Sequence, residues 1–510
     1  MQERKSLLNF RPAVILTAGL ILGILIGYLK TFISSGLAVT IFIMIATVIL
    51  AFAIFFIVKK RKLKFVFCIL IIAASLLGMI MMGAKLKFPT KTINGEKFEG
   101  SVKEIYFEYL TDSGYDYSVL IKGDIESDSN AVIYAKLSTK TRIYQGTKIS
   151  FIASFEPINY GDYSFSSGAK YTATDISNVQ VLGLNGLIPE MKFKLLKSLE
   201  QSLPKTFYLT YALLTGETVY IPDSKIINYQ NVGVAHLFAV SGLHIGLLYG
   251  VLAVVFSLLK VKAKISFPII ELLLFCYAGF CGFSASTLRA FIIITAYQSA
   301  SLLGVKSDKS TNLFLSAFIV LAINPTDLFT LGFLLSFSVY AGLIFLANPL
   351  EKRLSKFLPK FFAKILAPCL ISEIVSMPIL IDMVGYCSAF GFLFNMVIIP
   401  FITLLYPLIL FSTILLAVTG FEIFAIIPNL SFAVIDRGLS LASTEIFMLR
   451  NFRFLISAIF YYLTLYTFSG KLNLSGKSLN ILRIIILLAF ILTFCAVNLP
   501  YCIDFFNLKC

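Results

Sequence analysis

The sequence predicts a polytopic α-helical membrane protein with a small β-barrel domain inserted after its third span. Apolar residues make up 58% of the 510 positions and charged residues only 14%, a composition far from that of a soluble domain. Apolar runs of about 20 residues, long enough to cross the hydrocarbon core of a bilayer, recur along the chain and predict about 10–12 membrane segments. One polar stretch, 88–190, interrupts them with a series of strand-like runs.

The N-terminal membrane region, 1–87, holds three predicted spans. They cover Ala13–Tyr28, Leu37–Val58 and Phe65–Ala84. We do not expect the first to be a signal peptide, because it lacks a small-residue cleavage site and two further spans follow at once. Glycine stands at every fourth position of this span, which is typical of a face that packs closely against another helix of the same chain. These glycines are Gly19, Gly23 and Gly27.

Basic residues gather in short loops, and this pattern predicts how the chain is oriented. The net charge is +16, and we attribute it mainly to the excess of Lys and Arg in cytoplasmic loops, with a smaller share left for an anionic substrate. Arg4, Lys5 and Arg11 precede the first span, and a basic cluster at 59–64 separates the second span from the third. We therefore expect a cytoplasmic N-terminus. A second cluster, at 352–364, is also expected on the cytoplasmic side.

The polar segment 88–190 is expected to form an extracytoplasmic, OB-like β-barrel. Turn signals separate strand-like runs at 115–122, 130–137, 148–155 and 176–182, and this spacing fits a small antiparallel barrel. OB barrels often bind single strands through aromatic side chains and a basic groove. The segment is rich in Tyr, but its 13 acidic residues outnumber its 9 basic ones. A DNA-binding role and a scaffolding role therefore both stay open.

From residue 206 the chain is apolar again. The segment 206–470 is expected to form a channel-type helical domain, and 471–510 a C-terminal membrane helix and tail. Apolar segments lie near 232–259, 265–283, 284–304, 311–323, 327–347, 361–381, 386–420, 421–448, 454–469 and 483–499. Several are short or interrupted by proline. Irregular backbone at membrane depth is tolerated only where it faces protein or a water-filled cavity, so we expect a pore or substrate cavity.

Both histidines of the protein, His236 and His244, lie in one apolar run and flank the pair Ser241 and Gly242. Histidine among aliphatic side chains costs free energy unless the ring finds a partner or faces water. The rings are therefore either hydrogen-bonded packing residues or part of a polar path. Catalysis by Ser241 and His244 is a weaker hypothesis, because no GxSxG motif accompanies them. A metal site is weaker still, since the two rings would stand about 12 Å apart along a continuous helix.

Arg289 lies deep in an apolar segment, where a guanidinium usually faces a cavity or an acidic partner. Nucleic-acid phosphates would also suit it, because the guanidinium fork donates two parallel hydrogen bonds to them. The acidic residues considered as its partners are Glu217, Asp223, Glu271 and Glu373.

Three further polar residues mark places where apolar segments are expected to break. They are Asn324, Ser336 and Asn395. The full set of predicted path-lining residues is Glu217, His236, Ser241, Gly242, His244, Arg289, Asn324, Ser336 and Asn395. We predict no catalytic residue, metal site or cofactor. The eight cysteines contain no CxxC pair, and the sequence leaves open whether Cys502 and Cys510 pair.

Several motifs, in order along the chain, resemble those of the bacterial ComEC competence family. GETVYIPDSKIINYQNVGVAHLFAVSGLHIGLL (216–248) is similar to the signature that opens the family's channel domain, and SASTLRAFIII (284–294) to its internal Arg-Ala motif. LAINPTDLFTLGFLLSFSVYAG (321–342) and MPILIDMVGYCSAFGFLFNMVIIP (377–400) are similar to the two following segments. EPINYGDYSF (156–165) is similar to the turn that closes the family's OB-like module.

The resemblance implies a multi-pass protein of the bacterial inner (plasma) membrane that passes single-stranded transforming DNA into the cytoplasm. Long members of the family carry a C-terminal metallo-β-lactamase-like domain, and this chain resembles a short form without it, so we do not expect an enzyme. The implied partners are single-stranded DNA, the lipid bilayer, a separate nuclease, a DNA receptor and a cytoplasmic helicase-type motor. The oligomeric state stays open. A small-solute or lipid-precursor transporter with this fold, and a hydrolase using Ser241 and His244, remain alternatives.

Overall fold

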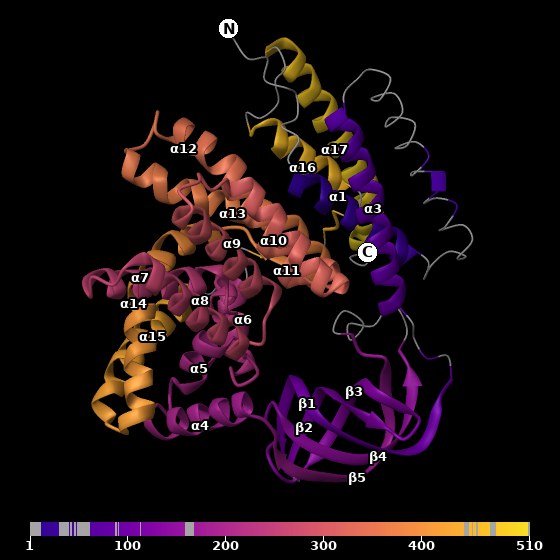
Figure 1. The fold of residues 1–510 in the computed structure, drawn as a ribbon, viewed down its shortest axis with the longest axis vertical. Coiled ribbons are helices and arrows are strands. Elements are labelled where there is room, and N and C mark those ends of the chain that lie inside the picture. Colours follow the sequence, from indigo (N-terminus) through magenta and orange to yellow (C-terminus); the bar gives the residue numbers. More distant parts are fainter. Residues whose placement is uncertain are drawn as a thin grey trace.

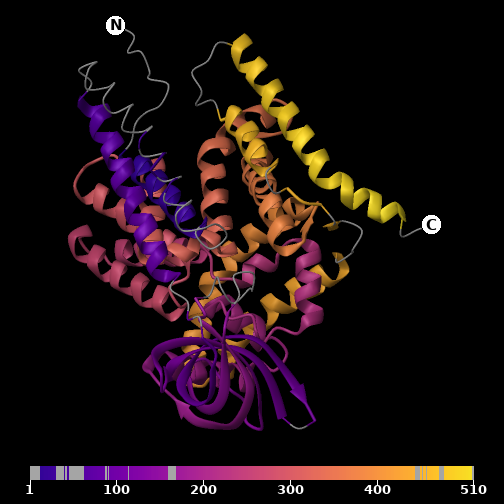
Figure 2. The same ribbon diagram turned by 90° about the vertical axis from the view of Figure 1, so that its right-hand side faces the viewer.

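The structure is a computed structural model that describes residues 12–29, 62–86, 91–112, 114–158, 168–442, 448–450, 452–454, 457–469 and 476–507, with single positions at 40, 43, 44, 47 and 89. A β-barrel lies at one end of a large helical part (Figure 1), and a view from the side shows the same arrangement (Figure 2). The chain is a polytopic helical membrane protein with a small barrel domain, as the sequence predicts.

The first two described helices, α1 (Pro12–Leu29) and α3 (Lys62–Lys85), pack against each other through glycines. A Cβ atom on Gly23 would stand only 1.9 Å from the carbonyl oxygen of Ser75. The other two glycines of the repeat approach α3 closely as well. The predicted glycine face of the first span is therefore confirmed as an internal packing surface.

Five strands close into a barrel in the order β1-β2-β3-β5-β4. All neighbouring strands are antiparallel except β3 and β5, which are parallel. This five-stranded closed barrel is the OB-like architecture that the sequence predicts. The strands are β1 (Ile93–Thr111), β2 (Gly114–Ile125), β3 (Asp128–Thr139), β4 (Thr147–Pro157) and β5 (Tyr171–Leu184).

Side chains that alternate along the strands fill the barrel interior, because successive residues of a strand point to opposite faces. Phe98, Phe151 and Phe155 form an aromatic cluster with ring centroids 5.1 to 6.4 Å apart. Val119 and Ile133 are fully buried beside it. The four predicted strand runs fall within β2 to β5 and are confirmed. β1 has no predicted counterpart, and the quoted turn motif 156–165 lies mostly outside the described residues.

Helices form the remainder of the described chain. The first eight after the barrel are α4 (Leu187–Ser202), α5 (Phe207–Thr215), α6 (Asp223–Val232), η2 (Ala235–Phe238), α7 (Gly242–Leu258), α8 (Ala263–Phe280), α9 (Ala285–Leu302) and α10 (Lys309–Ile323). The next are η3 (Pro325–Phe329), α11 (Leu331–Gly342), η4 (Leu343–Ala347), α12 (Asn348–Leu354), α13 (Lys360–Val384) and α14 (Gly391–Thr419). The last are η5 (Glu422–Ala425), α15 (Ile426–Ala442), α16 (Ser457–Thr467) and α17 (Gly476–Asn507), while β6 (Tyr386–Ser388) and β7 (Met448–Arg450) form a small two-stranded sheet.

Within the described residues, seven helical stretches are long and apolar enough to cross a membrane, and two shorter apolar helices accompany them. The shorter ones are α7 and α10. The predicted second span, 37–58, falls almost wholly outside the described residues. Interrupted helices are frequent in the helical part: η2 precedes α7, η3 separates α10 from α11, and the π-helical turn η4 follows α11. The expected irregular backbone between the apolar segments is therefore present.

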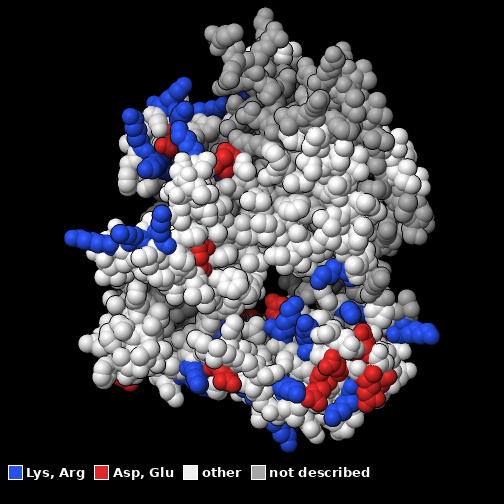
Figure 3. Space-filling model, in the orientation of Figure 1, with Lys and Arg blue, Asp and Glu red and all other residues white. Residues whose placement is uncertain are grey.

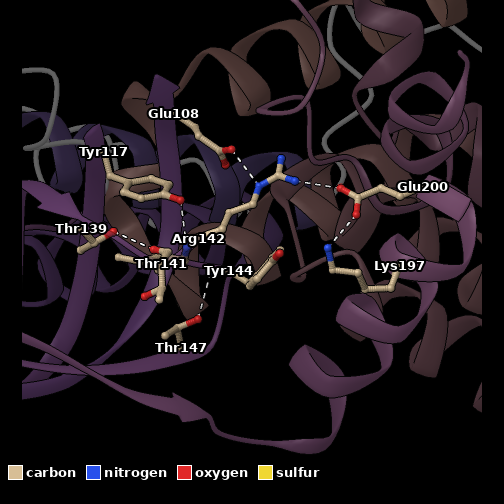
Figure 4. Close-up of polar contacts among 10 residues, drawn as sticks. Glu108, Tyr117, Thr139, Thr141, Arg142, Tyr144, Thr147, Lys197 and Glu200 are labelled. Atoms are coloured by element: carbon tan, nitrogen blue, oxygen red, sulfur yellow. Dashed lines mark hydrogen bonds and ion pairs between the residues drawn. The ribbon is translucent and has the colours of Figure 1, made fainter. Parts of the chain in front are cut away.

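An ion-pair network fixes the barrel to α4, the first helix after it (Figure 4). Arg142, in the loop between β3 and β4, donates from Nε to Glu108 of β1 and from Nη1 to Glu200 of α4, each over 2.8 Å. Glu200 also accepts a hydrogen bond from Lys197. The Arg142 guanidinium lies 4.9 Å from the centroid of the Tyr220 ring. Charge-assisted hydrogen bonds to two elements thus set the orientation of the barrel on α4.

Of the two carboxylate oxygens of Glu108, only Oε1 has a hydrogen-bond partner among the described residues. Burial raises the pKa of the Glu108 carboxyl above its usual 4.5, although Arg142 beside it acts in the opposite direction. The Oε2 atom is buried and has no hydrogen-bond partner among the described residues. Desolvation of this carboxylate therefore outweighs the ion pair that it makes.

A second, apolar contact joins the barrel to the N-terminal helices. Tyr28 of α1 and Leu86, just after α3, pack against Leu120, Tyr134 and Ile158 on the outside of the barrel. Leu120 and Ile158 are buried there. The barrel is consequently held at two separate places on the helical part.

Candidate functional site

The helix α7 begins at a break inside the helical part, and Ser241 caps it. α6 ends at Gly233, whose φ of 79° is the left-handed conformation that favours glycine. After η2, the backbone is extended at Ser241. The Ser241 hydroxyl accepts a hydrogen bond from the Leu243 N–H (3.3 Å), and the Ser241 N–H donates to Nδ1 of His244 (3.0 Å). The Ser-x-x-His spacing is thus a capping box in which histidine takes the place of the usual Glu or Gln.

The His244 ring belongs to a buried polar seam. Nδ1 accepts the Ser241 N–H, so the ring proton is on Nε2. His244 is fully buried, and its Nε2 has no hydrogen-bond partner in the part of the chain that the structure describes. The ring meets Tyr406 of α14 edge-on at 4.9 Å. The Tyr406 hydroxyl lies 2.8 Å from that of Tyr277 in α8, which donates to the Leu214 carbonyl of α5. The seam therefore crosses four helices.

Arg289 of α9 lies against the first residue of α7. A Cβ atom on Gly242 would stand 2.6 Å from Nη2 of Arg289, so only glycine permits this approach. Nε of Arg289 donates to the Ser336 hydroxyl of α11 over 2.7 Å, and that hydroxyl donates to Ser286 over 3.1 Å. The guanidinium also lies 4.8 Å from the centroid of the Tyr340 ring. The starts of α7 and α9 and the middle of α11 thus meet at one guanidinium.

This guanidinium is buried without an anion. Arg289 is 8% exposed, and among the described residues its two terminal nitrogens make no hydrogen bond or ion pair. They face the N-terminus of α7, which carries a partial positive charge. Two positive groups placed together favour an anionic ligand beside them. Arginine suits phosphate, because its planar fork donates parallel hydrogen bonds to the phosphate oxygens.

Glu217 was predicted beside this site, but the structure places it at the junction with the barrel. Its Oε1 accepts from Lys192 of α4 over 2.6 Å and its Oε2 from the Tyr211 hydroxyl over 3.0 Å. Lys192 is 5% exposed on its side chain and also donates to Gln145, beside Arg142 in the barrel loop. A buried lysine needs such an acceptor nearby. Glu217 is therefore bound to Lys192 and Tyr211, and its place on the path stays a prediction.

Two of the other proposed acidic partners of Arg289, Glu271 and Glu373, lie against other groups. Glu271 of α8 accepts from Thr295 and Gln298 of α9. The Glu373 carboxylate lies 2.9 Å from the point where a Cβ on Gly391 would stand, at the start of α14. A carboxylate is favourable at a helix N-terminus. Among the described residues, no carboxylate forms an ion pair with Arg289, so of the two predicted partners, a carboxylate or a phosphate, the phosphate stays a prediction.

The remaining predicted residues make no hydrogen bond to Arg289 among the described residues. Asn324 bonds to Asp327 (2.6 Å) and accepts from Thr326 (3.0 Å), so it shapes the turn between α10 and η3. Asn395 is buried on α14 with its Oδ1 unsatisfied. His236 is exposed on η2.

The structure therefore brings together five of the predicted residues. They are Ser241, Gly242, His244, Arg289 and Ser336. Sequence reasoning missed Tyr277, Tyr406 and Lys192. Lys192 left a signal, because it shares a helical face with Leu196 and Leu199, both fully buried.

Comparisons with known proteins match a part of the chain that contains this site. A family model described as "Competence protein" matches residues 213–473, just over half of the chain and the whole segment from α6 to α16. ComE operon protein 3 of Bacillus subtilis (strain 168) is 30% identical over 200 residues, which are 39% of this chain and 25% of that protein. The matched part thus spans about a quarter of the length of that relative. No solved structure matches the chain.

The family match contains the α7 break, Arg289 and Ser336, and it agrees with the ComEC-like motifs of the sequence. Because the model covers more than half of the residues, the chain belongs to the Competence protein family.

Proposed function

We propose that this chain is a channel component in a bacterial plasma membrane that passes single-stranded DNA into the cytoplasm during natural competence. Membership of the Competence protein family supports a role in DNA uptake. The helices long enough to span a bilayer support a position within the membrane. In this proposal the protein moves its substrate without catalysing a reaction.

The observation that carries the proposal is the buried Arg289 guanidinium, which faces the start of α7 and binds no carboxylate of the described residues. Moving a phosphate across a low-dielectric slab is costly unless fixed positive groups replace its water. Arg289 and the α7 N-terminus would supply these groups to one phosphate at a time. Tyr340 beside them offers a ring face on which a base of a single strand can stack. His236 and Asn395 complete the proposed path.

The barrel would guide the strand rather than grip it. Lysines and carboxylates are mixed over the barrel surface (Figure 3), so it has no continuous basic groove on this face. A tight non-specific DNA platform is uniformly basic. The Lys192–Glu217 pair and the Arg142 network hold the barrel against the helical part. A receptor outside, a separate nuclease and a cytoplasmic motor would complete the uptake apparatus.

The hydrolase alternative has one geometric argument, since the Ser241 hydroxyl lies 3.2 Å from Nδ1 of His244. That nitrogen has a single lone pair, and the Ser241 N–H already donates to it. A general base for the hydroxyl needs the same lone pair. Replacement of Ser241 by Ala would abolish a hydrolase, whereas it should cost a channel only a helix cap, about 1 kcal/mol.

Uptake of end-labelled DNA into a nuclease-resistant cytoplasmic pool tests the proposal. A deletion strain would be complemented with the wild-type chain, Arg289→Gln, Arg289→Lys or the control Lys264→Gln, which removes an exposed lysine. Loss of charge-assisted hydrogen bonds predicts about a tenfold or larger fall for Arg289→Gln. Arg289→Lys should keep part of the activity, because it keeps the charge but not the fork. A deletion strain that internalises DNA as well as its parent would refute the proposal.

A further inference from the structure

A strongly basic surface lies at the end of the molecule away from the barrel. It is formed by the hairpin of α12 and the first turns of α13, and we refer to it as the basic hairpin. Figure 3 shows blue atoms gathered there, over the place where Figure 1 labels α12. Glu351 is the one acidic residue between 348 and 364. The exposed cations are Lys352, Arg353, Lys356, Lys360 and Lys364.

Large aromatic side chains stand between these cations and point away from the protein core. Phe357 is 87% exposed, Phe361 68% and Phe362 48%. Aromatic rings so exposed are costly in water but favourable at the boundary between headgroups and acyl chains. Lysines beside them can extend their ammonium groups toward the headgroups. The combination fits a membrane surface better than a soluble polyanion, which would leave the three rings in water.

A cavity of about 360 Å³ opens beside the same hairpin. Its apolar wall comes from the π-helical turn η4, and such turns often occur at functional sites. Its polar lining residues are Asn348, Lys352 and Ser469. The lining residues are Ile344, Phe345, Asn348, Pro349, Lys352 and Ser469. The cavity thus offers both a cation and apolar side chains to a ligand.

We propose that the basic hairpin and this cavity bind an anionic phospholipid. The phosphate would lie against Lys352 and its neighbouring cations, and an acyl chain against Ile344 and Phe345. Basic pockets between membrane helices on the cytoplasmic side are known to select anionic headgroups. Five cations against one carboxylate select an anionic headgroup over a zwitterionic one. The inference does not depend on DNA transport, so either one can fail without the other.

The chain has no tryptophan, and this permits a direct test. Phe357→Trp introduces a single fluorophore in the full-length protein, which is placed in nanodiscs with brominated phosphatidylglycerol or brominated phosphatidylcholine. We expect stronger quenching by the anionic lipid at equal mole fraction. Neutralising three cations with Lys352→Gln, Lys356→Gln and Lys360→Gln should weaken this preference about a hundredfold, since each contributes about 1 kcal/mol near an anionic surface.

The matched control neutralises Lys260, Lys262 and Lys264, three exposed lysines around the start of α8. It removes the same charge and should leave the preference unchanged. Equal quenching by the two lipids would overturn the proposal. An equal loss of lipid preference in the control would overturn it too, because any basic surface of the protein would then attract the anionic lipid. Absence of quenching by both lipids would place Phe357 outside the bilayer and overturn it as well. Gel filtration and thermal unfolding verify that each variant is folded.

Discussion

At Gly242 the absence of a side chain brings two positive groups together. The point where its Cβ would stand is 2.6 Å from Nη2 of Arg289. One turn later, Gly246 has open space at the same point. The first glycine is thus required by the close approach of Arg289, whereas the second is not, although both lie within the first turns of α7.

Gly242→Ala should therefore push the guanidinium away from the start of α7. We expect DNA uptake to fall about as far as in Arg289→Gln, while overpacking against the flexible end of an arginine destabilises the fold by no more than about 1–2 kcal/mol. Gly246→Ala is the control and should keep normal uptake. Both are measured by cytoplasmic uptake and by thermal unfolding of the purified protein. Equal uptake by the two variants would contradict the role given to this contact.

Only some residues of the candidate site could be predicted from the sequence. Histidine, serine and arginine in apolar runs stand out, because each costs free energy there. Tyr277 and Tyr406 do not stand out, since tyrosine is common in membrane helices and their hydroxyl contact joins residues 129 positions apart. That no carboxylate of the described residues binds Arg289 could not be predicted either. Glu217 bonds to Lys192, and Glu373 lies at the α14 N-terminus, through contacts between segments far apart in the sequence.

Among the elements, the strands of the barrel were predicted except the longest one. β1 has 19 residues, with register shifts between Val102 and Glu104 and between Ile105 and Phe107. Bulges of this kind change which residue faces the core and destroy the period-2 pattern that reveals a strand. β3 keeps this alternation over most of its length, whereas the pairing of β4 with β5 also contains register shifts, and those strands were recognised from β-branched and aromatic residues between turn signals.

The α1–α3 pair gives a prediction on helix packing. Gly23→Ala places a methyl group 1.9 Å from a backbone oxygen of α3, and backbone cannot move aside as a side chain can. We expect a loss of about 1–3 kcal/mol in unfolding free energy. Gly83→Ala, on α3 with nothing within 4 Å of the new methyl group, should be neutral or slightly stabilising through helix propensity. Thermal unfolding in detergent compares them, and equal effects would contradict the tight pairing of α1 with α3.

The Glu108–Arg142 contact gives a prediction on pH. Burial raises the Glu108 pKa above 4.5, so its contribution to stability is complete below that pH and is lost as the pH rises through the folded value. Glu108→Gln has no carboxyl to ionise and so does not lose this stability. Its melting temperature should therefore rise relative to that of the wild type as the pH rises above 4.5. Glu99 is the opposite case, because Lys148 lowers its pKa. The melting temperature of Glu99→Gln should fall relative to that of the wild type as the pH rises, and this difference should be small and salt-sensitive. The same trend in both variants would contradict the assignment.

At the scale of the whole molecule, the two ends differ in charge as the sequence predicts. The barrel lies at one end and the basic hairpin at the other (Figure 1). The number and placement of basic residues in short loops predicted this difference in charge, because Lys and Arg are in excess in cytoplasmic loops. What the sequence did not reveal is how the barrel attaches, since the contacts of Arg142 and Lys192 join segments that are 25 to 58 residues apart.

Cysteine labelling tests this orientation. Glu126→Cys lies in the exposed turn between β2 and β3, and Lys356→Cys lies in the basic hairpin. In spheroplasts a membrane-impermeant maleimide should label the first variant above the parent chain and the second only after permeabilisation. The reverse pattern would place the barrel in the cytoplasm and would rule out its role as the receiving domain.

The central claim is that a DNA strand passes Arg289 on its way through the membrane. Site-specific photo-crosslinking in competent cells tests it most directly, with a photoreactive amino acid at Tyr340, whose ring lies 4.8 Å from the guanidinium. The control position is Leu488, which is 54% exposed on α17. We predict that labelled DNA is captured at position 340 during uptake, as a single strand, and is not captured at position 488. Normal uptake with no capture at position 340 would show that the strand takes another route and would contradict the account.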